Sequence, residues 1–564
     1  MAALAAPYAP RRPTETVLYR TVRRNLESFV AYAREHYDGG LPGYVEAELR
    51  AYLKCGVFSE GFTRCHCDAC GHDLLVAFSC KRRGICPSCA GRRMANTAAH
   101  LVDRVVPDVP VRQFVLSLPY ELRRLAAFKA EVLGAIARIF VEVVFARYRA
   151  RAEAGGIDRA QCGAVTFVQR FGGSLNLNIH FHTAFLDGVF TRDERGHVRF
   201  HCAAAPETTE LQAIVSRVHR RVVAWLRRHG HIDLRPMEDR SNGPPEAGAL
   251  EACAAIAMQR GAFAKLAADD DRGAGAGEGE PRKLRFAAEH EGFNLHAGVR
   301  IAAGDDLGRE RLMRYGARPA LALDRLRCLP DGRIAYRVKY TRAGAAKHRV
   351  MSPVEFLARL CAITPPPRFP LVRFHGVLGP RSSWRSEVVP RPRDATSVCD
   401  RAARAKGDAR AARNSTSGIP TGGKPSPQPR ASRETDEADR STPDAATPST
   451  TTSSGGSPSS VASDVIHLTP NVLAVRQWRR LHEGALVATT PYVDWATLMR
   501  RSFDVDVFAC ATCGGRLRVL AVITEMEPVR RILAHLGLES DAPPLARARD
   551  PTDELEGASA GEPM

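Results

Sequence analysis

Two histidines separated by one residue, His180 and His182, are the side chains of this sequence best placed for chemistry. They stand in residues 176–182, Asn-Leu-Asn-Ile-His-Phe-His, where polar and apolar residues alternate. Such alternation is typical of a half-buried β-strand, so both imidazoles should project from one face about 7 Å apart. Neutral imidazoles at this spacing can bind one divalent metal ion. The pair alone is a weak signal, because polar residues on a solvated strand face give the same pattern.

Cysteines form a second candidate site near the N-terminus. Four of them occur in two Cys-x2-Cys pairs, Cys67 and Cys70 followed by Cys86 and Cys89. Two such pairs at this separation predict a tetrahedral zinc site with four thiolate ligands. Four thiolates leave no open coordination position, so this zinc is expected to be structural. Cys65 or Cys80 could replace one of the four.

A third pair, Cys510 and Cys513, lies far along the chain and has no evident partner pair. A second zinc site and a turn with free thiols are equally compatible with it. The sequence contains 15 cysteines and no apolar stretch of 18 residues or more. With no secretory signal at the start, these cysteines are expected to be metal ligands or free thiols of a cytoplasmic, nucleoid-associated protein.

The elements around the histidines should form a β-hairpin. Residues 164–170 are expected to be a strand, and Gly172-Gly173-Ser174 a turn into the histidine strand. Gln169 would then lie beside the histidines, where its side-chain oxygen could be a third metal ligand or could simply pair across the strands. His296 is a second candidate ligand, although a satisfied core histidine is the more ordinary interpretation. Another strand is expected at 111–118, followed by a long helix at 122–151.

The formal charge of +19 favours a polyanionic partner, although an arginine-rich composition alone would produce it. The basic residues nearest the cysteine pairs are Lys81, Arg82, Arg83, Arg92 and Arg93. Arg220 and Arg221 lie on a basic helix expected at 210–229. All seven are candidates for contacts with DNA phosphates, and a plain solvated surface is the alternative.

Three segments in order resemble the motifs of the HUH nuclease superfamily. They are Arg-Gln-Phe-Val-Leu-Ser-Leu-Pro at 112–119, the histidine segment at 176–182, and Leu-Met-Arg-Tyr-Gly-Ala-Arg-Pro at 312–319. With a four-cysteine module in front, the chain resembles the rolling-circle transposases of the insertion-sequence-ninety-one group, including common-region elements. The resemblance covers about residues 20–380, with a further family-like segment near 470–540. Phe-His-Gly-Val-Leu-Gly-Pro at 374–380 is similar to the piece that closes the catalytic region of that family.

The resemblance implies a metal-assisted transposase that acts on single-stranded DNA ends, with no membrane partner and no small-molecule substrate. His180 and His182 would hold Mg²⁺ or Mn²⁺, and Tyr315, in the last turn of a helix at 309–318, would be the nucleophile that forms a 5′-phosphotyrosine link. Two-tyrosine members carry Tyr-x3-Tyr in this helix, but here the flanking positions are Arg311 and Pro319. The chain therefore resembles the single-tyrosine subset.

Alternatives remain for the nucleophile and for the function. Tyr336 and Tyr340 have the spacing of a tyrosine pair, but residues 333–340 are expected to be a strand, and Tyr315 could be merely an aromatic packed at a helix end. A plasmid replication initiator or relaxase would share the same histidines and tyrosine. A zinc-dependent DNA-binding protein with a decayed site is the non-enzymatic alternative. The oligomeric state is left open.

The expected fold is α+β, with a central antiparallel sheet that carries the metal on its inner face and helices on its back. An acidic, glycine-rich insertion loop is expected at 268–281. The expected division of the chain is a zinc-binding domain at 15–108, the catalytic domain at 109–380, a disordered Ser/Thr/Pro-rich linker at 381–466, a small C-terminal segment at 467–540 and a flexible tail at 541–564.

Overall fold

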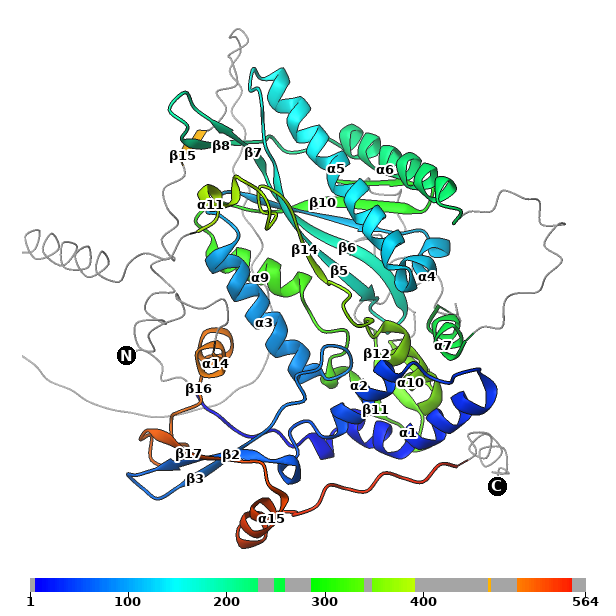
Figure 1. Ribbon diagram of the computed structural model, residues 1–564, viewed down its shortest axis with the longest axis vertical. Coiled ribbons are helices and arrows are strands. Elements are labelled where there is room, and N and C mark those ends of the chain that lie inside the picture. Colours follow the sequence, from blue (N-terminus) through cyan, green and yellow to red (C-terminus); the bar gives the residue numbers. More distant parts are fainter. Residues whose placement is uncertain are drawn as a thin grey trace, which may run out of the picture. The chain divides into compact units, whose positions relative to one another are not determined.

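The computed structural model describes residues 6–231, 248–258, 286–338, 347–390, 465–467 and 494–549. All of these residues belong to one unit, formed by residues 1–391 together with 464–564 (Figure 1). The insertion loop expected at 268–281 lies outside the described residues, as does most of the linker expected at 381–466. The first residues of that expected linker are described and include the short helix α11 (Arg385–Val388).

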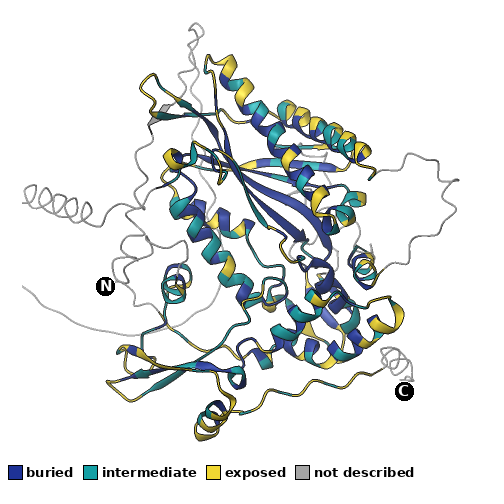
Figure 2. Cartoon of the chain, in the orientation of Figure 1, coloured by how far each residue is buried: buried dark blue, intermediate teal, exposed yellow. Residues whose placement is uncertain are grey.

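A six-stranded antiparallel sheet forms the centre, in the order β14-β5-β6-β4-β10-β9 (Figure 1). The strands are, in that order, Val372–Gly376, Gly163–Phe171, Leu177–Leu186, Val111–Ser117, Phe293–Ile301 and Ala287–His290. The expected α+β fold is confirmed, and the predicted hairpin is β5–β6. All ten residues of β6 are buried, so its alternating pattern marks two packed faces rather than one buried and one solvated face (Figure 2).

The back of the sheet packs against α5 (Ala130–Ala154). Phe185 of β6 lies edge-on to Phe140 of this helix, with ring centroids 6.0 Å apart. Helices α4 (Tyr120–Phe128) and α6 (Thr208–Arg228) lie beside α5. The single helix predicted at 122–151 is interrupted at Lys129, whose extended backbone (φ −100°, ψ 102°) separates α4 from α5.

The other face of the sheet carries α3 (Pro87–Arg104) and α9 (Asp306–Gly316). Leu101 of α3, Leu312 of α9 and Ala184 of β6 share one hydrophobic cluster, so both helices pack on the face that also bears the histidines. Helices therefore cover both faces of the sheet and not the back alone, as Figure 2 shows. The helix predicted at 309–318 begins one turn earlier, where the Asp305 carboxylate accepts the Gly308 N–H at 2.8 Å.

The N-terminal and C-terminal segments meet in a second, three-stranded sheet in the order β17-β2-β3. Strands β2 (Phe62–Cys67) and β3 (Asp73–Ala77) form a hairpin, and β17 (Leu517–Ile523) pairs antiparallel with β2. Two helices precede this hairpin, α1 (Val17–His36) and α2 (Gly43–Leu53). The C-terminal helices are α14 (Trp495–Phe503) and α15 (Met526–His535).

Shorter elements complete the described chain. The strands are β1 (Ala6–Pro7), β7 (Gly188–Arg192), β8 (Val198–Cys202), β11 (Leu326–Cys328), β12 (Ile334–Arg337), β13 (His348–Met351), β15 (Val465–His467) and β16 (Val505–Asp506). The helices are α7 (Ala249–Met258) and α10 (Pro353–Ile363), with 3₁₀ turns η1 (Pro13–Glu15), η2 (Phe58–Glu60) and η4 (Leu323–Arg325).

Candidate active site and metal centres

The two histidines lie side by side on β6, with ring centroids 4.9 Å apart. Both are buried, His180 with 4% and His182 with 5% of its surface exposed. The Nδ1 atom of His180 lies 3.1 Å from the carbonyl oxygen of Asn178. Because a carbonyl can only accept a hydrogen bond, Nδ1 carries the proton and Nε2 keeps its lone pair. This tautomer is the one that can bind a metal ion through Nε2.

The second histidine contacts Gln113 of β4, whose side-chain amide nitrogen lies 3.1 Å from Nδ1 of His182. Because an amide nitrogen only donates, Nδ1 of His182 accepts this hydrogen bond, and metal binding through Nε2 would require the Gln113 amide to turn its oxygen to Nδ1. Burial, together with His180 and the positive charge of Arg318, holds the pKa of His182 well below its usual value. His182 is therefore neutral at neutral pH, as metal binding requires. The expected alternation within strand 111–118 could have found Gln113, since it lies on the same face as the histidines.

Tyr315 reaches this pair from the last turn of α9. Its ring centroid lies 5.2 Å from that of His182, and the two rings are nearly perpendicular at 89°. Tyr315 is 41% exposed, in contrast to the buried histidines. The structure thus brings together the three side chains predicted to be catalytic, with the phenol on the solvent side.

Gln169 lies where the predicted hairpin puts it, directly across from His180 in the β5–β6 pair. Its amide nitrogen donates to the backbone carbonyls of Tyr315 and Gly316, at 2.9 and 3.0 Å. Its side-chain oxygen accepts from Nε of Arg318 at 3.2 Å. Gln169 therefore satisfies carbonyls at the end of α9 and fixes the tyrosine against the sheet. Its role as a metal ligand stays a prediction.

Arg318 is a site residue that the sequence analysis missed. Its guanidinium lies over the ring of Tyr315, 4.8 Å from the centroid, and over that of Phe171 at 5.2 Å. A cation at this distance from the phenol ring adds a fixed positive charge where a phosphate would approach. The only sequence signal is its place in the third motif, three residues after the tyrosine.

The alternative site residues do not complete the histidine site. His296 is on β10, across from Val115 of β4. Within the described part of the chain, groups of three or more His, Cys, Asp or Glu side chains close enough to hold a metal occur only among cysteines, so His296 does not complete a group with the histidine pair. Tyr336 is 1% exposed within β12, which argues against it as a nucleophile, and Tyr340 lies outside the described residues.

The cysteines form two clusters rather than the single predicted site. Cys86 and Cys89 join Cys55 and Cys80, whereas Cys67 and Cys70 join Cys510 and Cys513. The predicted grouping of Cys67, Cys70, Cys86 and Cys89 is therefore wrong. The physical reason is the β2–β3 hairpin, which holds Cys67 and Cys70 where the turn before β17 of the distant C-terminal segment, rather than α3, completes the set.

The first cluster is built on the start of α3. Cys86 precedes its first residue and Cys89 lies in its first turn. The sulfur atom of Cys55 lies 3.5 Å from that of Cys86 and 3.6 Å from that of Cys89. Arg11 donates from Nη2 to the same Cys55 sulfur at 3.0 Å, and Cys80 donates its backbone N–H at 3.3 Å. Such donors stabilise thiolates, so this donor set suits a structural zinc ion.

The predicted DNA-binding residues divide into two groups. Arg83 donates to the carbonyl oxygens of Pro366 and Phe369, and Arg221 pairs with Glu142 at 2.5 Å, so both have partners within the protein. The others are wholly or partly exposed: Lys81, Arg82, Arg92, Arg93 and Arg220. Arg93 also donates to the backbone carbonyl of Lys81 at 3.1 Å. The same arginine lines a pocket that also contains Gln169 and Arg318. This pocket therefore brings Arg93 of the zinc-binding module together with Arg318, whose guanidinium lies over the ring of Tyr315.

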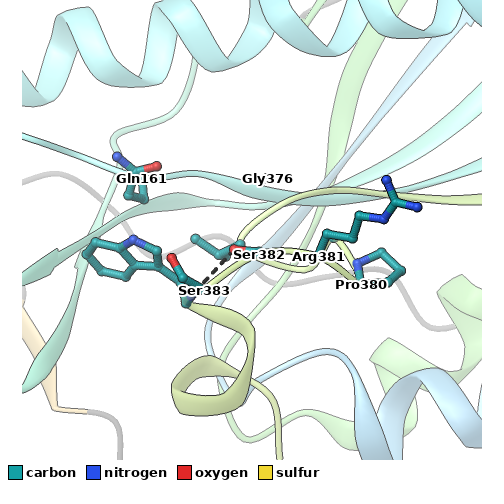
Figure 3. Close-up of a pocket in the computed structure, with 9 residues that line it drawn as sticks. Gln161, Gly376, Pro380, Arg381, Ser382 and Ser383 are labelled. Carbon is teal, nitrogen blue, oxygen red and sulfur yellow. Dashed lines mark hydrogen bonds between the residues drawn. The ribbon is translucent and has the colours of Figure 1, made fainter.

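A second pocket lies at the far end of the sheet, between Gln161 and the loop from Gly376 to Trp384 (Figure 3). Gly376 pairs with Gly163 at the start of β5, six residues or about 20 Å from Gln169. The loop is held in shape by Trp384, whose backbone N–H donates to the Ser382 hydroxyl at 3.3 Å. This pocket contains none of the residues predicted to be catalytic, so the histidine–tyrosine site is the better candidate.

The fold and these sites define a class: an α+β protein whose antiparallel sheet carries a buried histidine pair beside a helix-borne tyrosine, preceded by a four-cysteine module. Comparison with known families agrees with this class. Residues 24–118 match the family described as "Transposase zinc-binding domain", and residues 163–385 match the family described as "Putative transposase". The two matches confirm the resemblance to transposases of the insertion-sequence-ninety-one group, with the zinc-binding segment first. No curated protein and no solved structure matches the chain.

These matches support a transposase role, with DNA as the partner. The zinc-binding family and the cysteine clusters together support structural zinc. None of the described helices has both the length and the apolar character that crossing a bilayer requires.

Proposed function

We propose that this protein is a transposase that cuts and rejoins single-stranded DNA ends by a rolling-circle-type mechanism, with Tyr315 as the nucleophile. The observation that carries the proposal is the contact between Tyr315 and His182, whose ring centroids lie 5.2 Å apart. The tyrosine is half exposed and the imidazoles beneath it are buried, so a DNA strand can reach the phenol from the solvent side.

The proposed reaction exchanges one phosphate ester for another. The phenol oxygen of Tyr315 attacks the scissile phosphorus, and the bond from phosphorus to the 3′ oxygen breaks. The tyrosine becomes linked to the 5′-phosphate of the downstream strand, the phenol proton is lost, and the upstream strand leaves as a 3′-hydroxyl after taking up a proton. Because the ester is not hydrolysed, a 3′-hydroxyl can later attack the phosphotyrosine and rejoin strands without ATP.

The residues around the tyrosine support this chemistry. His180 and His182 would hold Mg²⁺ or Mn²⁺ through a ring nitrogen each, and we keep Gln169 as the proposed third ligand; its oxygen accepts one hydrogen bond from Arg318 among the described residues, which leaves a lone pair for the ion. When bound, the ion supplies Lewis-acid stabilisation of the scissile phosphate. Arg318 places a further positive charge beside the phenol, where it can bind the phosphate and favour its attack. Exposed basic residues such as Arg93 would guide the strand into the site.

The test is a covalent-adduct assay on purified full-length protein. Single-stranded DNA that contains candidate element ends, labelled at either end, is incubated with Mg²⁺ or Mn²⁺ and run on a denaturing gel. We expect a metal-dependent protein–DNA band that keeps only the DNA 3′ to the nick. The band should be lost in Tyr315→Phe and in His182→Ala, and retained in Tyr336→Phe, a matched change at a buried tyrosine.

Two outcomes would count against parts of the proposal. A band that survives Tyr315→Phe but disappears when Tyr336 and Tyr340 are changed would move the nucleophile and leave the mechanism. Tight DNA binding without any band, unchanged by His180→Ala, would favour a protein that binds DNA without cutting it.

A further inference from the structure

The second cysteine cluster joins two parts of the chain that are far apart in sequence. Cys70 and Cys510 are separated by 440 residues, yet their sulfur atoms lie 3.6 Å apart. The sulfur atoms of Cys67 and Cys513 are also 3.6 Å apart, and all four lie within 4.8 Å of one another. The C-terminal pair lies outside both segments that match known families.

These distances suit a metal ion rather than disulfides. Four sulfur atoms placed tetrahedrally at the usual zinc–sulfur distance of about 2.3 Å are separated by about 3.8 Å along each edge. A disulfide requires a sulfur–sulfur distance near 2.05 Å, and all four cysteines are free thiols. The observed 3.6 Å separations are therefore close to those of a four-thiolate zinc site.

The two halves of the cluster have the same local geometry. In each, a Cys-x2-Cys pair is followed by a glycine with a left-handed backbone, Gly71 with φ of 73° and Gly514 with φ of 71°. Each glycine donates its backbone N–H to the carbonyl of the first cysteine of its pair, in both cases at 2.9 Å. The Gly515 N–H also donates to the sulfur of Cys513 at 3.4 Å. Two such turns facing each other are the usual frame of a four-cysteine zinc site.

The surrounding strands bring these turns together. Leu517, the first residue of β17, pairs with Cys67, the last residue of β2. Both turns therefore lie at the same end of the three-stranded sheet (Figure 1). Helix α15 packs on this sheet through Val529 and Leu533, which are buried against Phe62 and Leu75. Only a small apolar cluster is available here, and a domain with so small a core usually needs a metal or disulfide for stability.

The C-terminal segment also reaches the tyrosine helix. Arg501 of α14 is 5% exposed and pairs with Asp103 of α3 and with Glu310 of α9, the latter at 3.1 Å. Glu310 in turn pairs with Arg314 at 2.5 Å, one residue before Tyr315. Arg501 thus links α14 to the helix that carries the tyrosine by one ion pair, and to α3 by another.

We propose that Cys67, Cys70, Cys510 and Cys513 bind a second zinc ion, and that this ion holds the C-terminal segment, residues 494–549, on the zinc-binding module and beside the tyrosine helix. The ion joins two halves of one zinc site that are supplied by the two ends of the chain. This inference does not depend on which residue is the nucleophile.

The first test is the zinc content of the purified full-length protein, measured by mass spectrometry of the metal after gel filtration in metal-free buffer. We expect two zinc ions per chain, and one in Cys510→Ser/Cys513→Ser and in Cys67→Ser/Cys70→Ser. Cys328→Ser, at an exposed cysteine outside both clusters, should keep two. One ion in the unmodified protein, or two in Cys510→Ser/Cys513→Ser, would overturn the proposal.

A companion measurement needs no variant. The protein is stripped of metal under reducing conditions and titrated with Co²⁺, and the thiolate-to-cobalt absorption is followed. Saturation at two equivalents supports two four-thiolate sites, and saturation at one contradicts them.

The second test asks whether the ion holds the C-terminal segment. A site for a specific protease is inserted within residues 400–460, the chain is cleaved, and the products are run on gel filtration. We expect the C-terminal fragment to co-elute with the rest of the protein, also in Cys328→Ser, and to separate in Cys510→Ser/Cys513→Ser. Separation in the unmodified protein, or co-elution in the double variant, would show that zinc does not hold this segment.

Discussion

The two cysteine clusters of this protein offer the same four sulfur ligands but are built in different ways. The first cluster is local: Cys55 and Cys89 lie 34 residues apart, and the second pair of ligands begins a helix. The second cluster draws on both ends of the chain, across 440 residues. Two of its cysteines, Cys70 and Cys513, are exposed, whereas in the first cluster three of the four are buried.

The difference between a local and a long-range cluster indicates what each one stabilises. The first fixes the start of α3, and α3 packs against α9 and the sheet that carries the histidines. The second closes a long loop in the chain and secures a segment with few buried residues of its own. We therefore expect the first to be essential for folding and the second to be a more labile connection.

The largest effect should follow removal of the first site, in Cys86→Ser/Cys89→Ser. Structural zinc contributes about 10–16 kcal/mol to the folding of small zinc modules, so its loss should unfold the region around α3. We expect the main thermal transition to broaden and fall by more than 10 °C, on the order of what several kcal/mol produces. Calorimetry checks this, with Cys510→Ser/Cys513→Ser as the matched variant that keeps the main transition. Equal losses in the two variants would contradict the contrast between the clusters.

The next effect concerns the rate of metal loss. Chelators reach exposed thiolates more readily than buried ones, so the cluster that contains Cys70 and Cys513 should release its ion first. Mixing the protein with a strong chelator and a zinc indicator should give two phases of equal amplitude. The fast phase should be absent in Cys510→Ser/Cys513→Ser. A single phase, or a fast phase that persists in this variant, would show that exposure does not govern release.

The sequence predicted the elements around the candidate active site because their signals are local. Alternation over residues 176–182 predicted β6, and the hairpin placed Gln169 beside His180, as the structure has it. The resemblance pointed to Tyr315 in the last turn of a helix, and α9 brings it to the histidines. What sequence alone missed were partners fixed by packing: Gln113 on a neighbouring strand and the guanidinium of Arg318 over the phenol.

The grouping of the cysteine pairs into two clusters could not be predicted for a similar reason. Spacing shows which cysteines form a turn, and it identified Cys67/Cys70, Cys86/Cys89 and Cys510/Cys513 correctly as pairs. Spacing does not show which turns face each other, because this depends on strand pairing between residues hundreds of positions apart. Cys55 completes its set without a Cys-x2-Cys partner of its own, so it carried no signal.

A smaller difference in zinc affinity should come from the arginine side chains near each cluster. Arg11 donates to the Cys55 sulfur at 3.0 Å, whereas near the second cluster Arg518 donates to the carboxylate of Asp68 at 2.7 Å. Loss of a donor to a ligand typically lowers metal affinity by about 10–100-fold. Arg11→Met should therefore weaken the first site by this amount, and Arg518→Met should leave the second nearly unchanged. Competition with a zinc indicator measures both, and equal effects would mean that the Arg11 contact does not stabilise the thiolate.

The smallest effect tests whether the two turns of the second cluster are equivalent. Gly71 and Gly514 both have left-handed backbones, and a Cβ at either would meet no atom within 4 Å. Substitution by alanine therefore carries only the backbone cost of about 1–2 kcal/mol, about a 5- to 30-fold loss of zinc affinity. Gly71→Ala and Gly514→Ala should weaken the second site equally and leave the first unchanged.

The matched position in the first cluster is Ala90, which follows Cys89 but continues a helix, with its N–H donating to the Cys86 carbonyl at 3.0 Å. Ala90 has a helical backbone, so Ala90→Gly changes no left-handed residue. The substitution should lower the stability of α3 by about 1 kcal/mol, the difference in helix propensity between alanine and glycine. Zinc titrations of the three variants decide the matter. If Gly514→Ala were neutral while Gly71→Ala was not, the C-terminal pair would not be bound in the turn seen here, and the two halves of the second cluster would not be equivalent.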